Sequence, residues 1–307
     1  MVRLKDHNPH NKIKMSFGEA AYSVFNYVIV TLVAMTMLYP ILNILAVSLS
    51  NYYEYLKSPW MIWPKGLNGE AYKFVFANSR FWRSYGNSIF ITVTGTVLGL
   101  LITALTAYPL SRRELKGKPV FMGILIFTMV FSAGMIPGYL NAKELGLLNN
   151  IWVLIIPGCF GAYNTILMIS FFKGIPYDYI EAATIDGASE PYIFFRVILP
   201  LSKPVLASIA LFLAVGYWNS YFGAQIYIRD RELWPMALML KEMLTEASTK
   251  ILEAENDAAA LGNLDEMLQP TTLQYASVIV ATVPILCVYP FLQKYFAKGV
   301  MLGGVKG

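Results

Sequence analysis

The hydrophobic positions of this chain fall into long continuous runs, and short amphipathic patterns are rare. Six runs reach about the 20 apolar residues that a helix needs to cross a bilayer. None of the six contains Asp, Glu, Lys, Arg or His. The pattern predicts an all-α integral membrane protein with six transmembrane helices, at about 24–49, 87–110, 120–140, 151–172, 204–226 and 273–293.

Composition supports this interpretation. Hydrophobic residues make up 56% of the 307 residues and charged residues only 14%, against about 25% charged in a typical soluble protein. So few charges would not cover a soluble surface, and the high hydrophobicity excludes disorder. We treat residues 1–307 as a single transmembrane domain. Prolines lie inside several runs, and we expect kinks at Pro137-Gly138 and Pro157-Gly158.

The distribution of Lys and Arg predicts the orientation, because cytoplasmic connections carry an excess of both. More than half of the 24 fall on one side if the N-terminus is cytoplasmic, and the short RRELKGK connection at 112–118 carries four. The net charge of +5 therefore reflects topology, and we expect no nucleic-acid partner. Both termini and the 173–203 connection are then cytoplasmic, and the acidic 227–272 segment is an extracytoplasmic loop.

The two long extracytoplasmic connections differ in character. Segment 50–86 is rich in aromatic residues, as at a membrane–water interface, and its part 70–86 is either an amphipathic surface helix or a simple loop. Segment 227–272 contains a polar, Ala-rich stretch that predicts an exposed helix ending near Gly262. A connection of this length is usually functional.

Residues able to perform catalysis are scarce. The two histidines lie near the N-terminus, and Cys159 and Cys287 sit inside apolar runs, where they are expected to pack. No metal-ligand motif and no GxxxxGK[ST] phosphate loop occurs. We expect no enzyme activity, no bound metal and no cofactor held by this chain. An ion-coupled secondary transporter of small polar solutes is the alternative function, although such proteins usually carry ionisable residues in their spans.

The 173–203 connection predicts two short helices. Residues 177–186 can be helical, with Gly187 as a left-handed stop, and Ser189 is placed to cap a second helix that has Glu190 and Pro191 in its first turn. Ala182 and Ala183 leave a nearly bare helix face that another protein can approach closely. A DNA-binding helix-turn-helix is excluded because acidic residues outnumber the nearby bases.

These residues resemble a known motif. Glu181-Ala182-Ala183, then Gly187 and Ile198-Leu199-Pro200, are similar to the EAA motif of ABC importer permeases. GYWNSYF at 216–222, Asn87-Ser88 and the ending KGVMLGGVKG resemble the carbohydrate-uptake class, in particular the smaller maltose-type permease and Gram-positive complex-oligosaccharide permeases. The resemblance covers nearly the whole chain.

The resemblance implies a type I ABC importer fold in a bacterial cell membrane. It implies a second permease, two ATPase subunits that bind ATP and Mg, an extracytoplasmic solute-binding protein and a sugar or oligosaccharide substrate. It assigns coupling to the ATPase to one set of residues and contact with the ATPase interface to the C-terminal tail. The first set is Glu181, Ala182, Ala183, Asp186, Gly187, Leu199 and Pro200, and the tail residues are Gly303, Gly304, Lys306 and Gly307.

Polar residues inside the predicted spans are candidates for a sugar path, since aromatic faces stack on sugars and amides bind hydroxyls. The other interpretation is that such amides join helices by hydrogen bonds. For Asn43 we favour the structural role, and Gln225 is a further member of the set. The two roles stay open for Asn164, Trp218 and Asn219.

Overall fold

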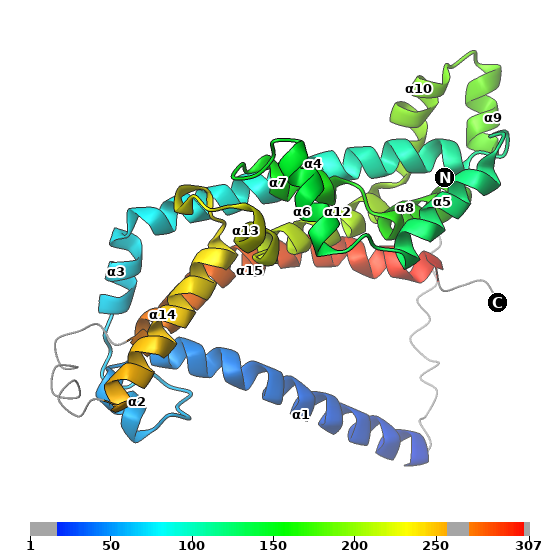
Figure 1. Cartoon of the computed structure of the whole chain (residues 1–307). Coiled ribbons are helices and arrows are strands. Elements are labelled where there is room, and N and C mark those ends of the chain that lie inside the picture. Colours follow the sequence, from blue (N-terminus) through cyan, green and yellow to red (C-terminus); the bar gives the residue numbers. More distant parts are fainter. Residues whose placement is uncertain (1–16, 257–269, 304–307) are drawn as a thin grey trace. The chain divides into compact units, whose positions relative to one another are not determined.

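The structure, a computed structural model, describes residues 17–256 and 270–303, which form helices joined by short connections (Figure 1). No β-strand occurs in these two ranges, so the predicted all-α class is confirmed there. The chain divides into two compact units, 1–69 and 70–307. Each is described by itself.

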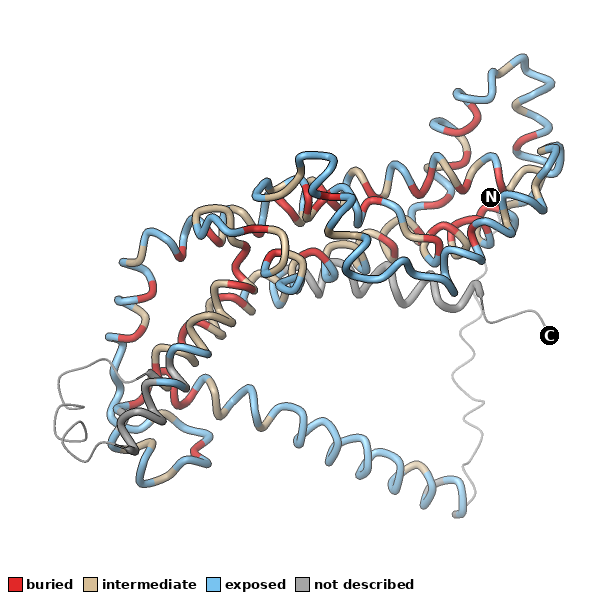
Figure 2. Tube along the Cα trace, in the orientation of Figure 1, coloured by how far each residue is buried: buried red, intermediate tan, exposed pale blue. Residues whose placement is uncertain are grey.

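The first unit contains α1 (Phe17–Ser48) and α2 (Tyr52–Lys57). Residues 21–48 of α1 are long and apolar enough to cross a membrane, and the residues are exposed over most of the helix (Figure 2). An apolar helix exposed in this way requires an apolar environment. The predicted first span at 24–49 matches α1.

Asn43 has a structural role inside this unit. Its Nδ2 donates hydrogen bonds to the carbonyl oxygens of Pro59 at 2.9 Å and Met61 at 2.8 Å. Ser50 supports the same loop, because its hydroxyl accepts a hydrogen bond from the backbone N–H of Lys65 at 3.0 Å. The Asn43 amide therefore holds the loop that follows α2. This is a structural role, as we favoured, but the amide binds a loop and not another helix.

The second unit is built around α4 (Ser79–Ser111). This helix packs against α8 (Ala162–Lys173) and α12 (Lys203–Asn219), and α12 also packs against α15 (Pro270–Gly303). The largest group of buried apolar side chains joins α4 and α8 to the 173–203 connection and α12; its members include Ala104, Ala107, Met168, Ile169, Phe172, Ile180, Ile193 and Ile209. The 173–203 connection therefore shares a core with α4, α8 and α12.

Two predicted spans are broken helices. α5 (Lys118–Val130) and α6 (Met135–Glu144) meet at 113°, and the pair α7 (Trp152–Ile155) and η1 (Ile156–Cys159) meets α8 at 42°. The second break follows Pro157-Gly158 closely, as predicted. The first lies at 131–134 and not at Pro137-Gly138, because Pro137 falls in the first turn of α6, where proline is tolerated.

Two helices, Ala21–Ser48 and Ser79–Ser111, are long and apolar enough to cross a membrane unbroken. The count rises to five if each of three bent pairs is one span, the third pair being Glu190–Leu201 with α12. α15 contributes a shorter apolar stretch, Thr271–Cys287, within the described residues. The helix that contains the second predicted span begins earlier than that span, at Ser79, since Asn78 caps α4 through a side-chain hydrogen bond from the N–H of Arg80. The preceding α3 (Glu70–Ala77) buries Ala71 and Val75, which favours the amphipathic-helix interpretation of that segment.

Segment 227–272 is attached to the start of α4. The chain passes through α13 (Phe222–Tyr227) and η3 (Arg231–Leu233) before it reaches this contact. Asn87 of α4 donates hydrogen bonds to the carbonyl oxygens of Glu232 at 2.8 Å and Trp234 at 3.1 Å. The hydroxyl of Ser88 accepts one from the N–H of Met236 at 2.7 Å. The predicted helix is present as α14 (Met236–Asn256), and its predicted end near Gly262 lies outside the described residues.

Candidate functional site

The 173–203 connection forms the two helices that its sequence predicts. α9 (Asp178–Ile185) ends in a C-cap motif in which the N–H of Ala188 donates to the carbonyl of Ala183 at 2.9 Å. Gly187 has a φ of +78°, a conformation that side chains with a Cβ rarely adopt. α10 (Glu190–Ile193) follows, with Ser189 at the N-cap position but without a side-chain hydrogen bond.

The two faces of α9 have different surroundings. Ile180 is buried on the inner face, and Ala183 is half-buried against the same core. The outer face carries Ile185, which is 80% exposed, together with exposed Glu181, Ala182 and Asp186. Ala182 is thus the more open of the two alanines. α9 is fixed on one side and presents an apolar side chain between two acids on the other.

A sharp bend connects the segment to the fifth predicted span. The helical run Glu190–Leu201, which includes the π-helical turn η2 (Phe194–Ile198) and α11 (Leu199–Leu201), meets α12 at 81°. Ser202 lies fully buried at the bend and donates to the carbonyl oxygen of Ile198 at 2.7 Å. Leu199 packs on the core, whereas Pro200 is exposed. The second helical run of the segment therefore leads directly into α12 through this bend.

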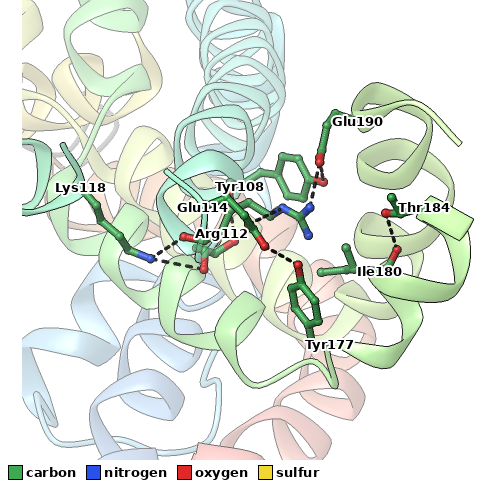
Figure 3. Close-up of polar contacts among 9 residues, drawn as sticks. Tyr108, Arg112, Glu114, Lys118, Tyr177, Ile180, Thr184 and Glu190 are labelled. Atoms are coloured by element: carbon green, nitrogen blue, oxygen red, sulfur yellow. Dashed lines mark hydrogen bonds and ion pairs between the residues drawn. The ribbon is translucent and has the colours of Figure 1, made fainter. Parts of the chain in front are cut away.

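A group of polar and aromatic residues joins the segment to the end of α4 (Figure 3). Arg112 Nη2 lies 2.8 Å from Glu190 Oε1, and the Tyr108 hydroxyl donates to Glu190 Oε2 at 2.5 Å. The Tyr177 hydroxyl donates a hydrogen bond to Glu114. We call these five residues, Tyr108, Arg112, Glu114, Tyr177 and Glu190, the Arg112 cluster.

The hydrogen bond between Tyr177 and Glu114 shifts the pKa values of both side chains. It holds the pKa of the Glu114 carboxyl below its usual value, because the phenolic O–H stabilises the carboxylate. The same contact raises the pKa of Tyr177. The pair therefore keeps its charge arrangement at neutral pH.

The Arg112 cluster was not predicted from the sequence. The RRELKGK connection indicated topology only, and Glu190 and Tyr177 were assigned as helix-end residues. The available signal was the combination of two arginines at the end of a span with an acidic first turn in the next cytoplasmic segment. Nothing in the sequence shows which of Arg112 and Arg113 reaches Glu190.

Of the residues predicted to line a sugar path, two lie together at the end of α12 and one lies on α8. Trp218 and Asn219 end α12, and the Trp218 ring packs edge-on to Tyr85 with centroids 5.8 Å apart. Asn164 is half-buried in the first turn of α8. Within the described ranges, neither Asn164 nor Asn219 forms a side-chain hydrogen bond. Gln225 is engaged, since its Oε1 accepts a hydrogen bond from Lys241 Nζ at 2.5 Å.

The remaining candidates are placed as follows. Gly303 is the last residue of α15, and Gly304, Lys306 and Gly307 lie outside the described residues. Cys159 is buried and contacts the carbonyl oxygen of Ile155 at 3.2 Å. Across the part of the chain that the structure describes, no group of three or more His, Cys, Asp or Glu side chains is arranged to hold a metal ion.

Comparisons with known proteins agree with this arrangement. The family described as "Binding-protein-dependent transport system inner membrane component" matches residues 95–302. Protein LplC of Bacillus subtilis is 44% identical over 275 residues, which is 89% of this chain and 90% of that protein. The polygalacturonan/rhamnogalacturonan transport system permease protein YtcP of the same organism is 37% identical, over 93% of this chain and 98% of that protein.

A solved structure is similar over nearly the whole fold. It belongs to a bacterial ABC transporter involved in the import of the acidic polysaccharide alginate, with a TM-score of 0.81 and 34% identity, and it matches 92% of this chain and 99% of that chain. The bent helices and the helical connection thus define a permease of the ABC importer type. The chain belongs to the binding-protein-dependent transport system inner membrane components. It is a transport subunit and not an enzyme.

Proposed function

We propose that this chain is one of two permease subunits of an ATP-driven importer of sugars or oligosaccharides, and that it couples transport to ATP hydrolysis through α9. The single observation that carries the coupling role is the outer face of α9. Ile185 is a large apolar side chain, 80% exposed, on a short helix outside the spans. Exposed apolar side chains rimmed by charges are typical of protein–protein interfaces.

The chemistry of this face indicates its partner. Glu181 and Asp186 flank Ile185, and neither carboxylate forms a side-chain hydrogen bond or an ion pair within the described chain. A partner that binds here needs an apolar recess with a basic rim. In the proposed complex this partner is one of two ATPase subunits, which bind ATP and Mg, and the present chain holds no cofactor.

The proposed membrane arrangement has six spans with both termini in the cytoplasm. The six spans are α1, α4, the bent pairs α5–α6 and α7–α8, α12 and α15. The 173–203 segment faces the cytoplasm, and segment 227–272 faces the outside. Lipid or the second permease surrounds the exposed apolar side chains of α1 and α5. The arrangement agrees with the inner-membrane description of the family. The ion-coupled alternative is not favoured, because the family works with a binding protein.

The substrate class rests on the relatives. The names of two of them describe transport of polygalacturonan or rhamnogalacturonan and import of alginate. We propose an oligosaccharide delivered by an extracytoplasmic solute-binding protein that docks near segment 227–272. Trp218, Asn219 and Asn164 remain the proposed path residues, since an aromatic ring and two amides without described hydrogen bonds suit a sugar.

The test of the coupling role is Glu181→Lys in the assembled transporter. We expect normal membrane insertion but a loss of at least tenfold in ATP-dependent sugar uptake, because a lysine opposes a basic rim. Glu144→Lys is the matched control, an exposed charge reversal on α6. Unchanged uptake in Glu181→Lys would remove α9 from the coupling surface.

A further inference from the structure

We call the 173–203 connection the coupling segment. Within it, one residue directly before α9 and one shortly after α9 contact the same arginine, Arg112, at the end of α4. Tyr177 precedes α9 directly, and its ring centroid lies 5.7 Å from the Arg112 guanidinium carbon. Glu190 is the first residue of α10, and it forms the 2.8 Å ion pair with the same guanidinium. Arg112 therefore contacts the residue directly before α9 and the first residue of α10, which follows α9 (Figure 3).

Arg112 is held more firmly than a surface arginine. Its side chain is only 13% exposed, and its guanidinium lies over the Tyr108 ring at 5.9 Å as well as over Tyr177. Nη1 is buried and has no hydrogen-bond partner in the described chain. Its two carboxylate partners are Glu190 at 2.8 Å and Glu114, whose Oε2 lies 3.7 Å from Nε. A largely buried cation depends on such partners, because removing one leaves its charge less compensated.

α4 extends from this contact to the opposite end of the unit. Asn87 and Ser88, near its beginning, bind the backbone of the 228–236 loop. The 25 residues from Asn87 to Arg112 span about 37 Å at 1.5 Å per residue of helix. One helix thus contacts the coupling segment at one end and the extracytoplasmic loop at the other (Figure 1).

The chain itself links the coupling segment only to α8 and α12. α8 runs into the segment at Lys173, and the Glu190–Leu201 run continues into α12. α4 has no such covalent link to it. Within the described residues, the segment is attached to the end of α4 by packing of the shared core, by the polar contacts of the Arg112 cluster and by Arg113 over the Tyr177 ring.

We propose that Arg112 is a positioning residue for coupling: through Glu190 it transfers displacement of α9 to α4, and through α4 to the 228–236 loop. The inference rests on the proposed function, since it assumes that the ATPase moves α9. It adds a path that the EAA motif does not contain. In this path the cytoplasmic event reaches the extracytoplasmic surface along α4 and not through α12 alone.

The experiment uses the complete transporter, with both permeases, the ATPase subunits and the binding protein, in proteoliposomes. Three quantities are measured: ATPase co-purification, sugar-stimulated ATP hydrolysis, and sugar transported per ATP hydrolysed. We expect Arg112→Gln to retain co-purification and hydrolysis but to lower transport per ATP by about tenfold. Arg113→Gln is the matched control. It removes the same charge one residue away, from a side chain that lies over Tyr177 at 5.0 Å but has no ion pair within the described residues, and we expect less than a twofold effect.

The exchanged pair Arg112→Glu with Glu190→Arg covers the case in which Arg112→Gln does not accumulate. If the ion pair transmits the displacement, the exchanged pair restores both protein level and transport per ATP to within about threefold of the parent. Restored protein level without restored coupling overturns the inference. Arg112→Gln with an unchanged ratio overturns it, and so does loss of ATPase co-purification, which would assign the cluster to docking.

The outcome is separable from that of the proposed function. If Glu181→Lys uncouples transport while Arg112→Gln does not, only the path along α4 fails. If Glu181→Lys has no effect, the coupling role of α9 fails first, and any Arg112 effect then has a different cause.

Discussion

The hydroxyl of Tyr217 donates a hydrogen bond to the carbonyl oxygen of Ile155 at 3.0 Å, across 62 positions in the chain. Ile155 ends α7, where the fourth predicted span changes to the turn η1. Tyr217 is buried on α12 and precedes Trp218 and Asn219 directly. One side chain, Tyr217, therefore connects the break between α7 and η1 to the proposed sugar-path residues of α12.

Substitution of Gly95 by alanine should disturb this junction. A Cβ at Gly95 would lie 2.5 Å from the Tyr217 ring, closer than real contacts allow. Overpacking of this kind costs about 1–3 kcal/mol. We expect Gly95→Ala to lower the thermal unfolding temperature of the purified protein, measured by a fluorescence or light-scattering melt.

Gly86→Ala is the control on the same helix. A Cβ there meets nothing within 4 Å, and alanine favours helix by up to about 1 kcal/mol. Adding Tyr217→Leu to Gly95→Ala should recover part of the loss by removing the ring. If Gly95→Ala melts at the temperature of the parent or above it, the packing described for Tyr217 is wrong.

The sequence predicted the helical class and the local form of the 173–203 connection, because both depend on local signals. Pro176 favours a helix start and Gly187 a helix end, whatever packs around them. The predicted sites of bending were less accurate, since Pro137 is compatible with a helix start and the break depends on neighbouring packing. The contacts of Arg112 and Tyr217 were not predictable, because 78 residues separate Arg112 from Glu190 and no periodicity encodes such a pairing.

The Tyr177–Glu114 hydrogen bond predicts a dependence on acid. The folded-state pKa of Glu114 is lowered, so its contribution to stability is present above the ordinary value of 4.5 and is lost as pH falls through the lower folded value. The raised pKa of Tyr177 keeps the donor protonated beyond pH 10. Tyr177→Phe should destabilise the protein at neutral pH, and the difference from the parent should shrink below about pH 4.5. Melts of both proteins across this range check it; a difference that is constant with pH would contradict the assignment.

Asn219→Ala tests the proposed sugar path with little structural disturbance. Asn219 is exposed at the end of α12, and substitutions at such positions usually change stability by less than about 0.5 kcal/mol. A lost hydrogen bond to sugar would weaken transport by a few-fold to about tenfold. Initial uptake rates at several sugar concentrations measure this. Asn141→Ala, an exposed asparagine on α6, is the control, and equal rates in the two variants would exclude Asn219 from the path.

Deletion of 303–307 tests the C-terminal tail. If the tail enters the ATPase interface, its loss should lower sugar-stimulated ATPase activity at least severalfold while the subunits still co-purify. The two quantities are compared in one preparation. Normal stimulated activity would show that the tail takes no part in coupling, and parallel loss of both would make it an assembly element.

The most direct test of the central claim is purification of the tagged chain from its native membrane in a mild detergent, with the co-purifying proteins identified by mass. We predict an ATPase, a second permease with about six spans, and a solute-binding protein whose bound ligand is a sugar or oligosaccharide. The chain alone or as a homodimer, with no ATPase under conditions that preserve known ABC complexes, would contradict the account.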